Sequence, residues 1–141
     1  MSTGDAEDVV SLWLSWKRAA EVSRGRILAE VIAHSALTEP ELTALTHLDE
    51  AGGALRQNAL AAATGWDRTR LSHLLSRMEE RGYVSRTRLR NGVDVTMRDA
   101  GREALASTKE PLTRAVWHSF ANRLTVQQQA SLREIIAALN E

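Results

Sequence analysis

The segment QNALAAATGWDRTRLSHLLSRMEERGYV, residues 57–84, predicts two short helices joined by a tight turn. We expect the first helix over 57–64 and the second over 68–81, with Asp67 as the N-cap of the second and Gly82 at its C-terminal end. Two helices in this order, with a glycine in the turn between them, form a helix-turn-helix.

Three positions fit the close packing of such a pair. Ala61 is small where the two helices approach, Gly65 suits the turn, and Leu71 supplies the apolar contact from the second helix. At about 100° per residue, one side of the second helix is apolar and the other is polar. The apolar side holds Leu71, Leu74, Leu75 and Met78, and the polar side holds Thr69, Ser72, His73, Ser76, Arg77 and Glu80.

A β-hairpin follows, over 83–88 and 93–97, with Asn91-Gly92 as its turn signal. A two-residue turn would set Val93 and Val95 opposite arginines. A three-residue loop over 90–92 pairs Leu89 with Val93 and Thr87 with Val95, which separates apolar from charged residues. We therefore expect the second register, with Arg86 and Arg88 on the exposed face and Arg90 at the tip. The hairpin makes the arrangement a winged helix-turn-helix.

Positive charge is concentrated in this part of the chain. The 141 residues carry no net charge, with 18 Lys+Arg and 18 Asp+Glu, but residues 54–92 contain eight arginines and three acids, a net charge of +5, and the remainder carries −5. A basic segment in an acidic chain is the electrostatic pattern of an anion-binding surface. A solvated, arginine-rich helix surface is the alternative explanation for the same cluster.

Double-stranded DNA matches the side chains on these elements. A major groove about 12 Å wide admits one helix, whose Arg, Ser, Thr and His side chains read base edges. Thr69, Arg70, Ser72 and His73 offer these groups on the second helix. Arg90 suits the narrower minor groove, while Arg86, Arg88 and the helix start at Gln57 suit phosphates.

The rest of the chain predicts long amphipathic helices. The first thirty-odd residues read as one helix capped by Asp5, Thr38 and Glu41 form a capping box for a second helix, and Pro111 interrupts a helix over about 99–122. A last helix runs over 125–139. The apolar stripes of the first and last helices are Val9, Leu12, Trp13, Trp16, Ala20, Ile27 and Val31, and Leu132, Ile135, Ile136 and Leu139. We expect the four tryptophans to be core residues, and the stripes to require a partner surface.

Composition excludes several classes of function. The length fits one domain, no apolar run is long enough to span a membrane, and the acidic N-terminus does not resemble a signal peptide, so we expect a cytoplasmic protein. The absence of cysteine excludes thiolate metal sites and thiol redox sensing. The four histidines are scattered, and no phosphate-binding, dinucleotide or hydrolase motif occurs. We therefore expect no enzyme activity, no catalytic residues, no metal and no cofactor.

The order of these elements resembles the MarR family of bacterial transcription regulators. The resemblance is carried by residues 37–48, by LRQNALA over 55–61, by WDRTRLSH over 66–73 and by RMEERGYV over 77–84. The segment TMRDAG over 96–101 resembles the family's sequence after the wing, and Leu124-Thr125 with its apolar helix resembles the C-terminal dimerisation helix. The wing departs from the pattern, because it is short and lacks the usual acid beside Arg90.

The resemblance implies a mostly α-helical homodimer with a small hairpin wing. Residues 1–35 and 99–141 would form the helical dimerisation region, and residues 36–98 the winged DNA-binding lobe. It places Thr69, Arg70, Ser72, His73 and Arg77 on the recognition helix and Arg90 at the wing tip. It also implies a ligand-responsive regulator, most often a repressor, acting on a near-palindromic operator and controlled by a small aromatic effector. The alternatives are a winged-helix module that binds protein instead of DNA, and a small enzyme.

Overall fold

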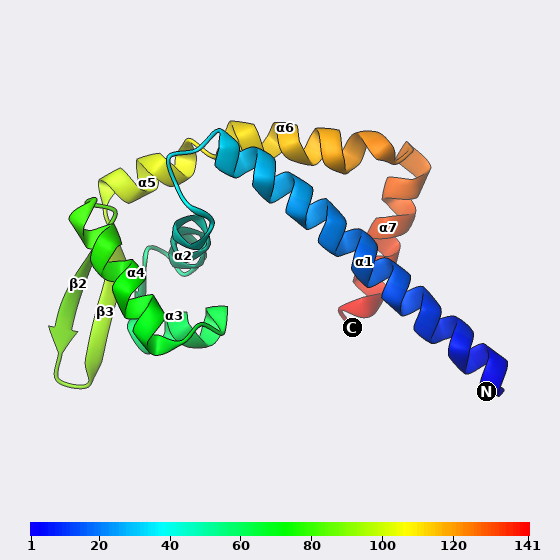
Figure 1. Ribbon diagram of the computed structural model, residues 1–141, viewed down its shortest axis with the longest axis horizontal. Helices are drawn as coiled ribbons and strands as arrows, with labels where there is room; N and C mark the ends of the chain where they lie inside the picture. The colour runs from blue at the N-terminus through cyan, green and yellow to red at the C-terminus, as the bar shows by residue number, and fades with distance from the viewer. The chain divides into compact units, whose positions relative to one another are not determined.

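The computed structural model describes all 141 residues as a mostly helical chain with one small antiparallel sheet (Figure 1). This confirms the expected fold class. The elements are α1 (Thr3–Ala33), α2 (Glu39–Glu50), β1 (Ala54–Arg56), α3 (Gln57–Thr64), α4 (Arg68–Glu80), β2 (Val84–Leu89), β3 (Gly92–Met97), α5 (Asp99–Ala106), α6 (Lys109–Ser119), the 3-10 helix η1 (Ala121–Arg123) and α7 (Val126–Leu139). No helix is long and apolar enough to cross a membrane.

The chain divides into two compact units. One unit, which we call the helical unit, comprises residues 1–33 and 110–141, and the other, the winged lobe, comprises residues 34–109. The family resemblance implies that the second segment of the helical region starts at residue 99. Helix α5 belongs to the winged lobe instead, because it packs on α2.

The winged lobe surrounds one apolar core. Its sheet has the order β1-β3-β2, and β1 is a strand that the sequence pattern did not predict. Helices α2, α3 and α4 and the sheet all contribute to this core. The fully buried side chains include Leu45, Leu48, Leu60, Leu71, Leu75, Met78, Val84, Val95 and Met97. The apolar side of α4 is therefore buried as its spacing predicts, and its polar side is left outside.

Local signals fix most helix ends in the lobe. Thr38 and Glu41 form the expected capping box at α2, and the Asp67 carboxylate accepts a hydrogen bond from the Arg70 backbone N–H at 3.1 Å. Gly65 adopts a left-handed φ of 72° between α3 and α4, which confirms the predicted turn. The Asp67 cap and the Gly65 turn set where α4 begins.

Two helix boundaries in the helical unit differ from expectation. Asp5 does not cap α1, because the helix begins earlier, and Ser2 Oγ accepts the Asp5 backbone N–H there. The Asp5 carboxylate in turn accepts hydrogen bonds from the Ser2 hydroxyl at 2.7 Å and from the Ser2 N–H at 3.2 Å, which lower the pKa of Asp5. The helix expected over 99–122 is two helices, and the break lies at residues 107–108. Pro111 then falls in the first turn of α6, where a missing N–H leaves no helical hydrogen bond unmade.

The helical unit leaves many of its large apolar side chains in solvent. Trp13, Trp16 and Trp117 are each at least half exposed, so the expectation that every tryptophan is a core residue is wrong for these three. Trp66 is half-buried against the lobe's core. Every exposed large hydrophobic side chain of the protein lies in this unit: Met1, Val9, Val10, Leu12, Trp13, Leu14, Trp16, Val22, Leu112, Trp117, Phe120, Val126, Ile135, Ile136 and Leu139.

Candidate nucleic-acid interface

The outward face of α4 carries four of the predicted recognition residues. Thr69, Arg70, His73 and Arg77 are exposed on it. The side chains of Arg70 and Arg77 make no ion pair, although Glu79 and Glu80 lie close to Arg77 in the sequence. Ser72 differs from these four, because it is half-buried and faces the hairpin.

Arginines of the basic segment fall into two groups. Arg56, Arg81 and Arg86 are ion-paired to Asp94, Glu41 and Glu79, respectively. The other five, Arg68, Arg70, Arg77, Arg88 and Arg90, are exposed and have no ion-pair partner. Three acids of the lobe thus pair with arginines that hold the fold, while the arginines exposed on α4 and the hairpin have no acid partner.

The register of the hairpin is not the expected one. Leu89 pairs with Gly92, Arg88 with Val93 and Arg86 with Val95, so the turn consists of Arg90 and Asn91 alone. The predicted pairing of Leu89 with Val93 is wrong. Cross-strand partners project from the same face of a sheet, so Arg86 and Arg88 share their face with the buried Val95 and not with the solvent side.

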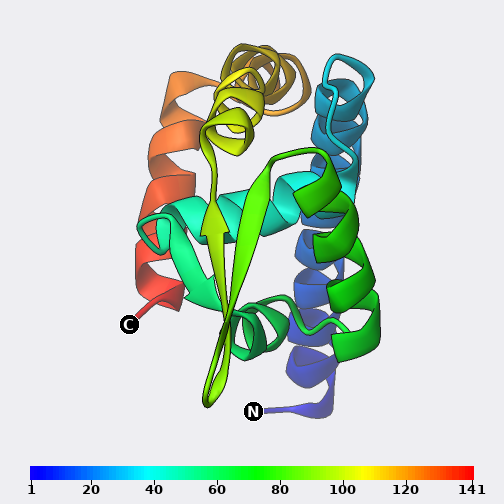
Figure 2. The same ribbon diagram turned by 90° about the vertical axis from the view of Figure 1, so that its left-hand side faces the viewer.

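This register turns Arg86 towards α4, which lies beside β2 (Figure 2). The Arg86 Nε atom donates to Glu79 Oε1 at 2.8 Å, and Nη2 donates to Ser76 Oγ at 2.7 Å. Its Nη1 atom lies 3.4 Å from both the carbonyl oxygen and Oγ of Ser72. The prediction that Arg86 lies on an exposed face is therefore wrong. The physical reason is the odd–even shift in register, which moves every side chain of a strand to the opposite face.

The tip of the wing is anchored from β1. The Arg56 Nε atom is 2.9 Å from Asp94 Oδ1, and Arg56 Nη1 donates to Asn91 Oδ1 at 3.0 Å. Arg90 lies in the turn next to Asn91 and is exposed. Arg88, in the second residue pair from the turn, is exposed as well. Asp94 is paired to Arg56, which β1 brings next to β3. Arg90 itself has no acid partner, as the departure from the family pattern indicates.

Gln57 begins α3 as predicted, but its side chain is not free in solvent. It is half-buried, and its Oε1 atom is buried without a hydrogen-bond partner. It lines a hollow of about 350 Å³ between α4 and the hairpin, together with Ser72, Glu79, Arg86, Arg88 and Val93. A phosphate contact from Gln57 would therefore come from the backbone N–H groups of the α3 start, where no side chain caps the helix.

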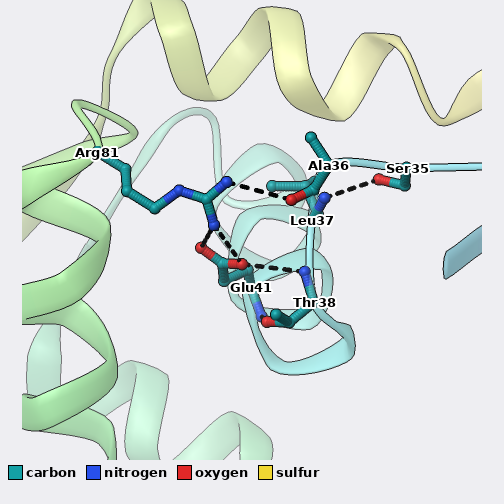
Figure 3. Close-up of polar contacts among 6 residues, drawn as sticks. All are labelled: Ser35, Ala36, Leu37, Thr38, Glu41 and Arg81. Carbon is teal, nitrogen blue, oxygen red and sulfur yellow. Dashed lines mark hydrogen bonds and ion pairs between the residues drawn. The ribbon is translucent and has the colours of Figure 1, made fainter.

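A buried carboxylate fixes the C-terminal end of α4 (Figure 3). Glu41 is 4% exposed and accepts hydrogen bonds from the Thr38 N–H at 2.9 Å and from Arg81 Nη1 at 2.8 Å. Arg81 Nη2 also donates to the carbonyl oxygen of Ala36 at 3.2 Å, and its guanidinium lies 4.8 Å from the centre of the Tyr83 ring. The position of Arg81 near the helix end suggests only a cation that complements the dipole, but the side chain connects α4 to the N-terminus of α2.

The structure contains no group of three or more His, Asp or Glu side chains that could hold a metal ion. The exposed arginine, threonine and histidine side chains of α4 and the hairpin can make hydrogen bonds and ionic contacts with an extended anion.

Comparison with known proteins finds the same fold in solved structures of MarR family proteins. Residues 37–93 match a family model described as a domain of unknown function, DUF7343. No curated protein gives a significant match. Among solved structures, a MarR family transcriptional regulator from Streptomyces coelicolor in complex with DNA is 28% identical, with a TM-score of 0.71 over 100% of this chain and 89% of that one.

Two structures of MarR from Escherichia coli are more distant in sequence. The oxidised form is 17% identical, with a TM-score of 0.76 over 89% of this chain and 93% of that one. A mutant form complexed with operator DNA is 15% identical, with a TM-score of 0.70 over 94% and 95%. The chain has the winged-helix fold of the MarR family of transcriptional regulators.

Proposed function

We propose that this protein is a sequence-specific DNA-binding transcription regulator. The observation that carries the proposal is the distribution of surface side chains on the winged lobe. Five arginines without ion-pair partners lie on α4 and the hairpin, and no large hydrophobic side chain is exposed anywhere in residues 34–109. A protein-binding surface is expected to be rich in apolar and aromatic side chains at its centre, whereas a DNA-binding surface is polar and positively charged.

The two elements of the lobe would contact different grooves. Thr69, Arg70, His73 and Arg77 would enter the major groove on α4, with Ser72 at the edge of that surface. Arg90 would reach the minor groove from the hairpin tip, and Arg88 would contact the neighbouring phosphates. The start of α3 at Gln57 would bind a further phosphate through its backbone.

We further propose that the protein acts as a homodimer through its helical unit. The apolar side chains that the unit leaves exposed on α1 and α7 include Leu12, Trp16, Ile135 and Leu139. Large apolar side chains exposed in this number are normally covered by a partner, and a second copy of the chain is the partner that a two-fold-symmetric regulator requires. Two lobes related by a two-fold axis would match a near-palindromic operator.

The regulatory outcome proposed is repression in the cytoplasm that a small aromatic effector relieves. It is supported by the resemblance to MarR regulators. The chain offers no thiol for a redox signal, which leaves ligand binding as the simpler route to regulation.

The rival function is a winged-helix module that binds another protein. The experiment that separates the two is a titration of the purified protein with duplex DNA from the region upstream of its own gene, followed by fluorescence anisotropy. We expect nanomolar specific binding, weaker binding to scrambled duplex, and weakening of the specific complex by aromatic acids. Equal, weak binding to both duplexes at physiological salt would contradict sequence-specific recognition.

A further inference from the structure

We propose that Arg86 is a positioning residue: together with Glu79 it holds the wing at a fixed angle to the recognition helix, and it does not itself contact DNA. The inference rests on the proposed function, since a recognition helix and a wing matter only if both meet DNA. It replaces the phosphate contact that the sequence pattern suggested for Arg86.

The guanidinium of Arg86 bridges two elements in three directions. It reaches Glu79 Oε1 at 2.8 Å, Ser76 Oγ at 2.7 Å and the Ser72 carbonyl oxygen at 3.4 Å, all on α4, while its own backbone lies in β2. The second carboxylate oxygen of Glu79 accepts the backbone N–H of Arg86 at 3.2 Å. One residue of the strand is therefore held to the helix through both its backbone and its side chain.

Burial and charge argue against a direct DNA contact. The side chain of Arg86 is 20% exposed and that of Glu79 is 35% exposed, so the pair is only partly accessible from outside. The Glu79 carboxylate pairs with Nε, and Ser72 and Ser76 face the two Nη atoms, which leaves little of the guanidinium available for a phosphate. Arg88, two residues on along the same strand face, is exposed and has no acid partner. Substituting each arginine in turn therefore distinguishes an effect on the position of the wing, at Arg86, from the loss of a direct DNA contact, at Arg88.

The geometric consequence concerns simultaneous binding. The helix and the hairpin are to occupy adjacent grooves of one duplex, so their relative angle must be set before binding for both to engage without an added ordering cost. The hollow between them, lined by Gln57, Arg86 and Arg88 among others, shows that apolar packing does not fill the outer part of this junction. The polar bridge is what fixes the angle there.

The test uses full-length protein and four variants: Glu79→Gln, Arg86→Lys, their double variant, and Arg88→Gln as the matched control. Binding to the upstream duplex is measured by anisotropy at several salt concentrations, and thermal unfolding confirms folding. We expect Glu79→Gln and Arg86→Lys each to weaken binding about tenfold, or about 1.4 kcal/mol. The double variant should bind DNA no more weakly than the more affected of the two single variants, because both substitutions break the same bridge.

The salt dependence and the wing's own dynamics complete the test. Glu79→Gln and Arg86→Lys should keep the wild-type slope of log affinity against log salt, while Arg88→Gln should reduce it by about one unit per subunit. In the free protein, amide hydrogen exchange in β2 and β3 should rise in Glu79→Gln and Arg86→Lys and not in Arg88→Gln. A merely stabilising pair would raise exchange across all of residues 34–109 and leave the affinity of the folded protein unchanged.

Wild-type affinity of Arg86→Lys, with tighter binding of Glu79→Gln, would overturn the proposal, since a lysine would then supply the phosphate contact and the acid would only oppose it. Unchanged hairpin exchange in both variants would overturn it as well. If the wild-type protein binds no duplex at all, the proposed function fails, while the exchange measurement still decides whether the bridge fixes the wing.

Discussion

The arginines of the lobe differ chiefly in whether a carboxylate lies next to them. Arg81 and Arg86 face carboxylates and hold elements together, while Arg70, Arg77 and Arg90 extend from the surface without an acid partner. Sequence position does not reveal this difference, because Glu41 lies 40 residues from Arg81. The individual effects of substitution should therefore fall into two groups, one acting on DNA affinity and the other on stability.

Arg70→Ala and His73→Ala are expected to relax sequence preference. Each good contact to a base edge contributes about 1–3 kcal/mol of discrimination, and both side chains lie exposed near the start of the recognition helix. The measurement is the ratio of affinities for specific and scrambled duplexes. Glu80→Ala, on the same helix but near its far end, is the control. Unchanged ratios in both variants would show that another surface reads the bases.

Arg90→Ala is expected to weaken binding to every duplex alike and to leave base preference nearly unchanged. The residue lies exposed in a two-residue turn, so its contribution is electrostatic. The slope of log affinity against log salt should fall by about one unit per subunit for each phosphate that Arg90 neutralises. Anisotropy at four or five salt concentrations measures it. An unaltered slope and affinity would mean that the short wing stops short of the DNA.

Arg81→Met is expected to destabilise the lobe without altering the surface that is proposed to contact DNA. It leaves the Glu41 carboxylate, 4% exposed, with the Thr38 N–H as its remaining charge-stabilising partner. Breaking a fully buried ion pair costs about 3–5 kcal/mol, and the partial exposure of Arg81 should bring the loss nearer 2 kcal/mol. Denaturant unfolding checks the value. Arg77→Met, an exposed and unpaired arginine on the same helix, should change stability little.

At the scale of elements, local chemistry predicted more than long-range pairing did. The Thr38–Glu41 capping box, the Asp67 cap and the Gly65 turn all depend on residues within four positions of each other, and all are present. The hairpin register depends on Arg86 meeting α4 and on β1 adding a third strand, and neither is a local property. The register was predicted by placing apolar and charged side chains on opposite faces of the hairpin. That criterion is misleading here, because Glu79 and Ser76 of α4 provide polar partners for Arg86 on the face that packs against the core.

Gly101→Ala tests how closely α5 packs against the rest of the lobe. Gly101 is buried in α5, and an added Cβ would clash with the carbonyl oxygen of Tyr83 and lie 3.2 Å from Met97 Cγ. Overpacking of this kind costs about 1–3 kcal/mol, and the melting temperature should fall. Gly25→Ala in α1, where an added Cβ meets nothing within 4 Å, should instead stabilise the helix by up to about 1 kcal/mol. Equal effects at the two glycines would contradict the packing described.

The whole molecule separates its two kinds of surface between its two units. The helical unit holds every exposed large hydrophobic side chain, and the winged lobe holds the five unpaired arginines on its helix and hairpin. The zero net charge of the chain conceals this separation. Composition alone therefore indicates neither DNA binding nor assembly, although the positions of the same residues along the sequence indicate both.

A stable dimer at micromolar concentration is the expected state. Ile136→Asp, which places a charge on the apolar face of α7, should shift the protein towards monomer and weaken operator binding with it. Gln127→Asp adds the same charge at an exposed polar position of α7 and is the control. Sedimentation velocity gives the mass of both. A folded wild-type monomer at this concentration would contradict the dimer and, with it, two-fold operator recognition.

The placement of the tryptophans gives the protein a built-in optical signal. Three of the four indoles lie at least half exposed in the helical unit, and only Trp66 lies in the lobe. Ultraviolet emission from the native protein is thus dominated by the unit that would associate. Dilution through the dissociation constant should shift the emission maximum to longer wavelength as the indoles meet water. No dye or tag is needed to follow assembly, and Trp66→Phe would remove most of the background from the lobe.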